Sequence, residues 1–150
     1  MNEMSYNVSR FQRSIRIDTD YQDLSIIDSF VSSETANKSI VQFCDHIKNG
    51  QQAFTWTGSY GSGKSSLALI LHGGLSHKNT QIYKKSLDLV SEEAKISIEK
   101  TFNKFSKRVV LPLVAGKKDL EKVILENLKK NNIKNHKNKN LFDLLDEISI

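Results

Sequence analysis

Apolar residues recur at helical spacing between Ser33 and Gly50. Ser33 or Thr35 supplies a hydroxyl that can cap a helix start, and Gly50 is a typical residue for ending one. The apolar positions in between share one helix face: Ala36, Ile40, Phe43, Cys44 and Ile47. The pattern predicts a helix here, with Cys44 as a small core residue.

Three further stretches carry helix signals. Lys64–Leu71 is composed of good helix formers and is expected to stop near the Gly73–Gly74 pair. Residues 82–107 are predicted to form one or two helices, and Asp119 can cap a helix that runs to about Lys130. Within residues 82–107, apolar residues at steps of three and four form one stripe along the predicted helices, which is typical of core packing. The stripe consists of Leu87, Val90, Ala94, Ile98, Phe102 and Phe105.

Four other segments carry strand signals. The stretch 52–57, QAFTWT, is rich in aromatic and β-branched residues and predicts a buried strand. Residues 109–114 form a continuous apolar run typical of a strand buried on both faces, although Pro112 counts against a central place in a sheet. Residues 14–17 alternate like a short strand, and residues 24–31 suit a strand or an irregular segment.

The order of these elements predicts the fold class. Strands that alternate with helices imply an α/β protein with a parallel sheet flanked by helices and right-handed crossovers. A chain of 150 residues fits one domain with one core. We expect an N-terminal segment over 1–32 and the α/β domain over 33–150.

Composition narrows the class of protein. A single cysteine excludes a disulfide framework and a cysteine metal cluster, and it suits a reducing compartment. The first 20 residues are polar and lack the apolar run of a signal peptide. The longest apolar run, Leu67–Leu71, is far shorter than the roughly 20 residues that a membrane span needs. The sequence therefore predicts a cytoplasmic protein without membrane contact.

The net charge of +5 is unevenly distributed, because lysines concentrate in the last third of the chain. A basic half of this kind could follow a nucleic-acid backbone. Aromatic residues are not interleaved with the lysines, so no platform for base stacking is visible. A solvated lysine- and asparagine-rich surface is therefore the favoured interpretation, and nucleic acid is the weaker one.

The candidate chemistry lies between the predicted strand 52–57 and the helix that follows. Gly58, Gly63, Lys64 and Ser65 match the pattern G-x-x-x-x-G-K-[ST]. Glycines let a loop curl so that backbone N–H groups point at one anion, and the helix dipole favours the same anion. The expected nucleotide-binding residues are Gly58, Ser59, Tyr60, Gly61, Ser62, Gly63, Lys64, Ser65 and Ser66.

These residues have distinct expected roles. Lys64 is the expected catalytic residue, which reaches the β- and γ-phosphates of ATP. The Ser65 hydroxyl is expected to ligate Mg²⁺, and Ser66 to contact the α-phosphate. The sequence therefore predicts a site for ATP and Mg²⁺.

At these residues the chain resembles the P-loop NTPase superfamily. The form TGSYGSGKSSLA looks most like the additional-strand ATPases of the AAA+ and STAND type, with a looser likeness to large prokaryotic ATP-binding proteins linked with mobile elements and phage defence. The resemblance implies a partial P-loop NTPase fold and places residues 28–34 near the adenine. It also implies a protein partner or self-association, because such ATPases often build their sites between subunits.

A hydrolase of this kind needs a second acidic site. Asp146 and Glu147 in LFDLLDE are candidates, but the apolar residues around them follow helix spacing rather than strand spacing. We therefore expect the chain to be the N-terminal part of a larger ATPase that drives remodelling or nucleic-acid-linked work. The alternatives are a non-catalytic nucleotide-binding interaction module and a small-molecule kinase, although the arginine-rich lid of such a kinase is missing.

Overall fold

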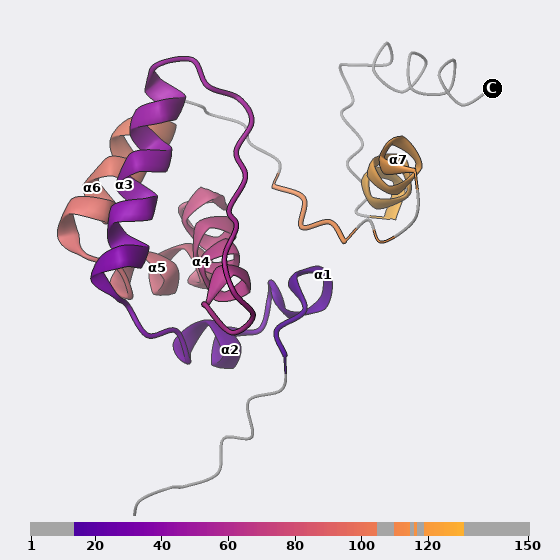
Figure 1. Cartoon of the computed structure of the whole chain (residues 1–150), viewed down its shortest axis with the longest axis horizontal. Coiled ribbons are helices and arrows are strands. Elements are labelled where there is room, and N and C mark those ends of the chain that lie inside the picture. The colour runs from indigo at the N-terminus through magenta and orange to yellow at the C-terminus, as the bar shows by residue number, and fades with distance from the viewer. Residues whose placement is uncertain (1–13, 105–109, 115, 117–118, 131–150) are drawn as a thin grey trace, which may run out of the picture. The chain divides into compact units, whose positions relative to one another are not determined.

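The computed structural model describes residues 14–104, 110–114, 116 and 119–130. The chain divides into two compact units, Met1–Arg108 and Val109–Ile150. The first unit contains the phosphate-loop motif and is drawn with its element labels in Figure 1. The domain boundary expected at residue 33 stays a prediction.

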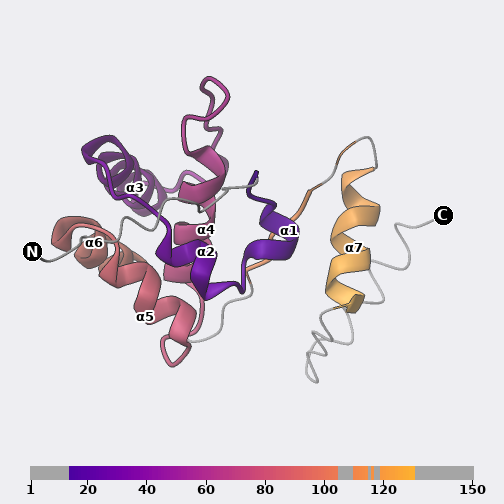
Figure 2. The ribbon, with the colours of Figure 1, turned by 90° about the horizontal axis from the view of Figure 1, so that it is seen from below.

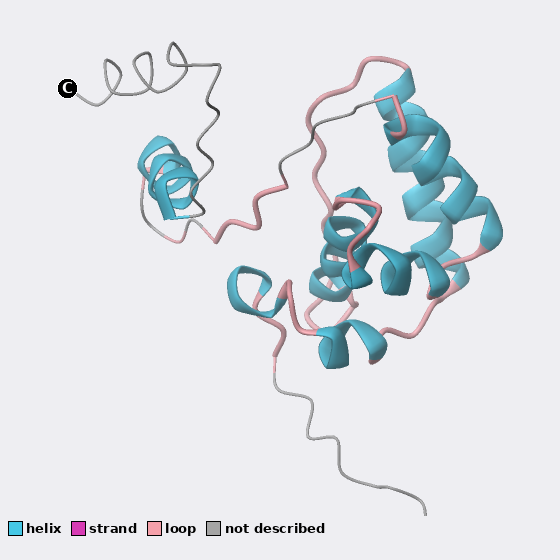
Figure 3. Ribbon diagram, turned by 180° about the vertical axis from the view of Figure 1, so that it is seen from behind, coloured by secondary structure: helices cyan, strands magenta, loops and turns pink. Residues whose placement is uncertain are grey.

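The described residues form helices and loops. Colouring by secondary structure shows no strand in this part of the chain (Figure 3). The helices are α1 (Ile17–Asp20), α2 (Leu24–Asp28), α3 (Glu34–Lys48), α4 (Lys64–Leu75), α5 (Gln81–Asp88), α6 (Glu92–Phe102) and α7 (Leu120–Lys130). The predicted α/β fold with a parallel sheet, and with it the partial P-loop NTPase fold, is therefore wrong.

The segment 52–57 explains this error. It is extended, but its backbone makes no strand pairing, and Ala53, Thr55 and Thr57 are exposed. Strand propensity describes residues that fit a pleated, half-buried surface, and it does not supply a partner strand. In this segment the aromatic side chains of Phe54 and Trp56 pack on a helix instead.

The strand predicted at residues 109–114 is also absent from the described residues. Residues 110–114 are described and have no strand pairing, whereas Val109 lies outside the described part. They also belong to the second compact unit rather than to the unit that contains residues 52–57. The prediction of a buried strand from this continuous apolar run is therefore wrong for residues 110–114.

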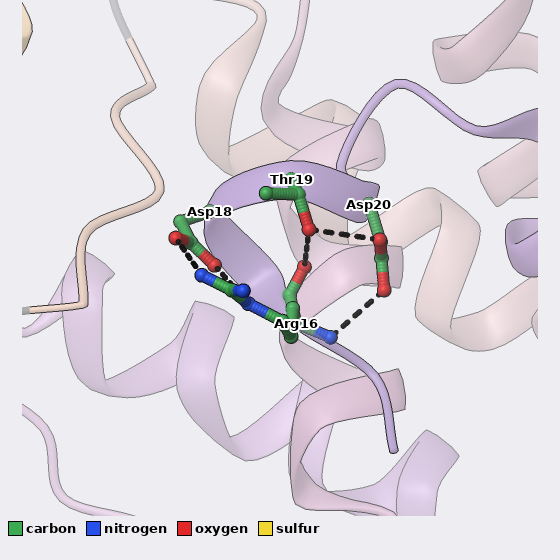
Figure 4. A network of polar contacts seen from close by, with 4 residues as sticks. All are labelled: Arg16, Asp18, Thr19 and Asp20. Atoms are coloured by element: carbon green, nitrogen blue, oxygen red, sulfur yellow. Dashed lines mark hydrogen bonds and ion pairs between the residues drawn. The ribbon is translucent and has the colours of Figure 1, made fainter. Parts of the chain in front are cut away.

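The predicted strand at residues 14–17 is replaced by a loop and the start of α1. The Asp20 carboxylate, which is buried, accepts hydrogen bonds from the Arg16 backbone N–H at 2.8 Å and from the Thr19 hydroxyl at 3.0 Å (Figure 4). The Arg16 guanidinium pairs with Asp18 at 3.0 Å. The Asp20 carboxylate thus satisfies the Arg16 backbone N–H, which has no partner within the helix. These contacts favour one helical turn here instead of a strand.

Residues 24–31 also contain a helix, α2, where a strand or an irregular segment was expected. Asp23 is its N-cap, and its carboxylate accepts from the Ser25 and Ile26 backbone N–H groups. The Ser25 hydroxyl donates to the same carboxylate at 2.6 Å and holds the Asp23 pKa below its usual value. Local capping therefore outweighs the strand propensity of the isoleucines.

The longer helices follow the sequence pattern closely. In α3 the Ser33 hydroxyl accepts from the Ala36 N–H at 3.1 Å, as a cap does, and Gly50 has a φ of 89° after the helix end. The stretch after residue 82 forms two helices, α5 and α6. The α4 helix ends at Leu75, one residue after the Gly73–Gly74 pair, so the stop expected near these glycines is confirmed.

The core of the first unit lies between two helix pairs. The α3 helix packs along α6, and α4 packs along α5, as two views show (Figures 1 and 2). Cys44 is buried in this core as expected, and burial raises the pKa of its thiol. The buried cluster contains Ile27, Ile40, Cys44, Leu67, Ile70, Leu71, Tyr83, Leu87, Ala94 and Ile98.

A membrane-spanning helix needs about 20 predominantly apolar residues. The described helices are all shorter than this. None of them is both long and apolar enough to cross a membrane.

Candidate phosphate-binding site

The phosphate-loop motif occupies the turn that leads into α4. The Ser62 N–H donates to the Ser59 carbonyl at 3.3 Å, and the helix begins at Lys64. Gly61 and Gly63 both have a φ of 80°, which lies in the left-handed region that favours glycine. The two glycines therefore let the loop turn sharply just before the helix.

Gly58 is required for a different reason, the close approach of a side chain. A Cβ atom at this position would lie 3.1 Å from the Ser62 hydroxyl oxygen. That contact is tighter than most real Cβ contacts, so a larger residue would push Ser62 outward. The first glycine of the motif thus keeps the loop closed.

Lys64 reaches back over the loop. Its ammonium donates to the Gly58 carbonyl at 3.0 Å, the Ser59 carbonyl at 2.7 Å and the Ser62 hydroxyl at 3.1 Å. An ammonium has three N–H donors, so all three are directed into the loop. The structure therefore places the positive charge of Lys64 inside the turn that the motif predicted to hold phosphate.

The start of α4 adds further donors. The first hydrogen bond of the helix runs from the Leu67 N–H to the Gly63 carbonyl at 2.9 Å. The N–H groups of the residues before Leu67 have no partner within the helix, and the helix dipole adds partial positive charge there. No side chain caps this helix end. Ser65 and Ser66 lie in the same first turn and are half-buried.

Tyr60 lies at the tip of the loop. The residue is 93% exposed, and its hydroxyl lies 3.1 Å from the Ser14 hydroxyl of the segment before α1. The contact is between two exposed side chains, so it adds little stability to the loop. Tyr60 is one of the residues expected to bind the nucleotide, and its role there stays a prediction.

Groups that could hold Mg²⁺ are few around this loop. Among the described residues, no three His, Cys, Asp or Glu side chains form a metal-binding group. Mg²⁺ on ATP takes most of its ligands from phosphates and water, so the Ser65 hydroxyl fits the role of a single protein ligand. Asp146 and Glu147, the candidates for a second acidic site, lie outside the described residues.

Sequence reasoning missed an aromatic groove next to the loop. Phe43 of α3 contacts Phe54 and Trp56, with ring centroids 4.7 and 5.7 Å apart. A cavity of about 160 Å³ lies along this contact. Phe54 and Trp56 belong to the aromatic and β-branched stretch that predicted a buried strand, and in the structure their rings pack on α3.

Comparison with known proteins leaves the motif as the basis of the assignment. No protein-family model matches the chain, and no curated protein or solved structure matches it. The resemblance to P-loop NTPases therefore rests on the loop residues alone. The geometry of the loop suits an anion for three reasons. Gly61 and Gly63 let the backbone turn sharply, the N–H groups at the start of α4 have no partner within the helix, and the Lys64 ammonium lies in the same loop.

Proposed function

We propose that the chain binds ATP with Mg²⁺ by holding the phosphate tail in the loop 58–63 and at the start of α4. The observation that carries the proposal is the position of Lys64, whose ammonium lies inside the loop that the motif defines. A lysine that pointed into solvent would give the motif no geometric support. The two glycines with positive φ give the loop its turn, which brings the lysine there.

A bound phosphate would replace the present hydrogen-bond partners of the Lys64 ammonium. The ammonium of Lys64 now donates to neutral carbonyl and hydroxyl oxygens. Hydrogen bonds between two charged groups are roughly twice as strong as bonds between neutral groups. Anionic phosphate oxygens are therefore better acceptors for Lys64 than its present partners, and the free N–H groups at the start of α4 are suited to the same anion.

The Ser65 hydroxyl would hold the Mg²⁺ that accompanies the triphosphate. Mg²⁺ bound with a phosphate chain keeps near-octahedral geometry and several waters, so one hydroxyl from the protein suffices as a contact. When bound, Mg²⁺ neutralises negative charge on the phosphates. Ser66, one residue further along the first turn, would contact the α-phosphate.

Hydrolysis would require more than this loop. A water-activating carboxylate must lie beside the γ-phosphate, and Asp146 and Glu147 are the candidates from the sequence. With such a group, the site would hydrolyse ATP to drive remodelling or nucleic-acid-linked work. A non-catalytic nucleotide-binding module needs only the loop. A cytoplasmic location, supported by the single cysteine, is part of the proposal.

The proposal is tested by isothermal titration of the folded chain with Mg·ATP. Lys64→Ala should weaken binding by tenfold or more, because hydrogen bonds to charged groups contribute about 1.5–3 kcal/mol. Lys84→Ala is the matched control, since Lys84 is an exposed lysine of α5. Equal affinity of wild type and Lys64→Ala, with both chains folded by circular dichroism, would contradict the proposal.

A further inference from the structure

The aromatic groove beside the phosphate loop has the composition of a base-binding site. It is formed by α3 on one side and by the extended segment before the loop on the other. Its lining residues are Ser39, Gln42, Phe43, His46, Gln51, Phe54, Thr55 and Trp56. Aromatic rings and neutral hydrogen-bonding groups thus occur together in one groove, without Lys, Arg, Asp or Glu in its lining.

The groove and the loop belong to one continuous piece of chain. Trp56 precedes Gly58 by two residues, and an extended chain spans at most about 3.6 Å per residue, so their Cα atoms lie within about 7 Å. The segment runs beside α3 and leads directly into the turn before α4 (Figure 1). A ligand with phosphates in the loop could therefore place its other end in the groove.

The size of the groove limits what it can hold. Its volume is about 160 Å³, whereas pockets for complete drug-sized ligands measure about 300–1,000 Å³. The groove is thus suited to one part of a nucleotide rather than to the whole molecule. A flat base fits this requirement, because the phosphates would be held elsewhere.

Trp56 provides the stacking surface. Its side chain packs against Phe43 with ring planes 51° apart, and 38% of the residue is still exposed. Stacking of a base on an aromatic ring is a common source of nucleotide affinity and tolerates different bases. A tryptophan held by a second ring and open on another side is preorganised for this contact.

Two amide side chains add hydrogen-bonding groups. The Gln42 side chain makes no hydrogen bond within the described part of the chain, so its carboxamide offers both a donor and an acceptor. The Gln51 amide nitrogen donates to the Ala53 carbonyl at 2.9 Å, which leaves its oxygen as an acceptor. Both kinds of group are present on the edge of a purine base.

We propose that this groove binds the purine base of the nucleotide whose phosphates lie in the loop 58–63. The inference rests on the proposed function, since it takes the loop as the phosphate site. It differs from the expectation that residues 28–34 lie near the base, which stays a prediction.

The single tryptophan of the chain allows a direct test. Stacking of a base on Trp56 changes its fluorescence, whereas a bare phosphate chain in the loop leaves the indole untouched. Mg·ATP should therefore quench the tryptophan emission, and Mg·tripolyphosphate should bind with little quenching. Isothermal titration of both ligands measures their affinities independently of the fluorescence.

A pair of variants identifies the contact. Trp56→Leu should weaken Mg·ATP binding about tenfold and leave Mg·tripolyphosphate binding unchanged, which also shows that the loop is intact. Trp56→Phe keeps an aromatic ring and should retain most of the affinity. Ile96→Ala is the matched control, because Ile96 is an apolar residue of α6 whose exposed fraction of 39% is close to the 38% of Trp56 and which does not line the groove. This variant should leave the preference for ATP unchanged.

The outcomes separate the two proposals. If wild type binds Mg·ATP and Mg·tripolyphosphate equally and Trp56→Leu changes neither, the groove does not hold the base, while the phosphate site stands. If neither ligand binds to the folded chain, the proposed function fails and this inference fails with it. Loss of both ligands in Trp56→Leu but not in Trp56→Phe would show a purely structural role and would also overturn the inference.

Discussion

At Gly73, a single hydrogen atom in place of a side chain lets α4 and α5 approach closely. A Cβ atom there would overlap the Ser86 hydroxyl oxygen and lie 2.8 Å from the Ser86 Cβ atom. Both residues are buried, so neither has space to move away without separating the helices. This contact explains why a glycine occupies position 73 inside α4.

Gly73→Ala should therefore destabilise the first unit. Overpacking costs about 1–3 kcal/mol, which exceeds the roughly 1 kcal/mol that alanine gains over glycine in helix propensity. The midpoint of urea unfolding measures the change. Gly74→Ala is the matched control, because its Cβ atom would meet the end of the Ile98 side chain at 3.2 Å, a group that can shift.

The contact itself is tested by a double variant. Gly73→Ala/Ser86→Gly removes the two Ser86 atoms that the new methyl group meets, so it should be more stable than the sum of the single changes predicts. Strict additivity would contradict the close contact between α4 and α5. An increase in stability for Gly73→Ala alone would do the same.

Single residues show which predictions a sequence supports well. The Ser33 cap and the burial of Cys44 were predicted, because both depend on residues within one or two turns of the same helix. The motif also indicated that Lys64 and the glycines act together, although their role in binding stays a prediction. The groove around Trp56 could not be predicted, because its two sides become neighbours only through packing of α3.

At the scale of elements, helices were predicted far better than strands. A helix satisfies its backbone within one segment, whereas a strand needs a partner that may lie anywhere in the chain. The helices α3, α6 and α7 occur where the periodicity placed them. The segment 52–57 had the composition of a strand but has no partner, so its aromatic residues pack on α3 instead.

Hydrogen–deuterium exchange tests this account of the segment 52–57. The amides of residues 54–57 have no backbone acceptor within the described residues, so they should exchange much faster than the amides of Ile40 and Cys44 in α3. Residue-resolved exchange measured by NMR gives the comparison directly. Slow exchange at every second residue of the segment would indicate strand pairing and would contradict the extended, unpaired conformation.

At the scale of the molecule, the chain consists of two units, and the proposed chemistry lies in the first. The sequence predicted one α/β domain, because strand signals were interpreted as parts of a common sheet. The phosphate loop does not depend on that sheet for its own geometry. Its turn comes from Gly61 and Gly63, and its charge from Lys64 at the start of α4.

The net charge of the whole chain offers a competing explanation for any nucleotide binding. A charge of +5, with many lysines in the last third, can attract anions without a defined site. Binding of that kind weakens strongly with added salt and is spread over many residues. A measurement that shows which residues respond to the ligand distinguishes this effect from binding in the loop.

The most direct test of the central claim is an NMR titration of the ¹⁵N-labelled chain with Mg·ATP at physiological salt. Phosphate binding in the loop predicts that the largest amide shifts occur at Gly63, Lys64, Ser65 and Ser66, and that Lys64→Ala abolishes them. Shifts confined to the lysine-rich residues 129–139, with the loop amides unchanged, would contradict the claim that this loop is a phosphate site.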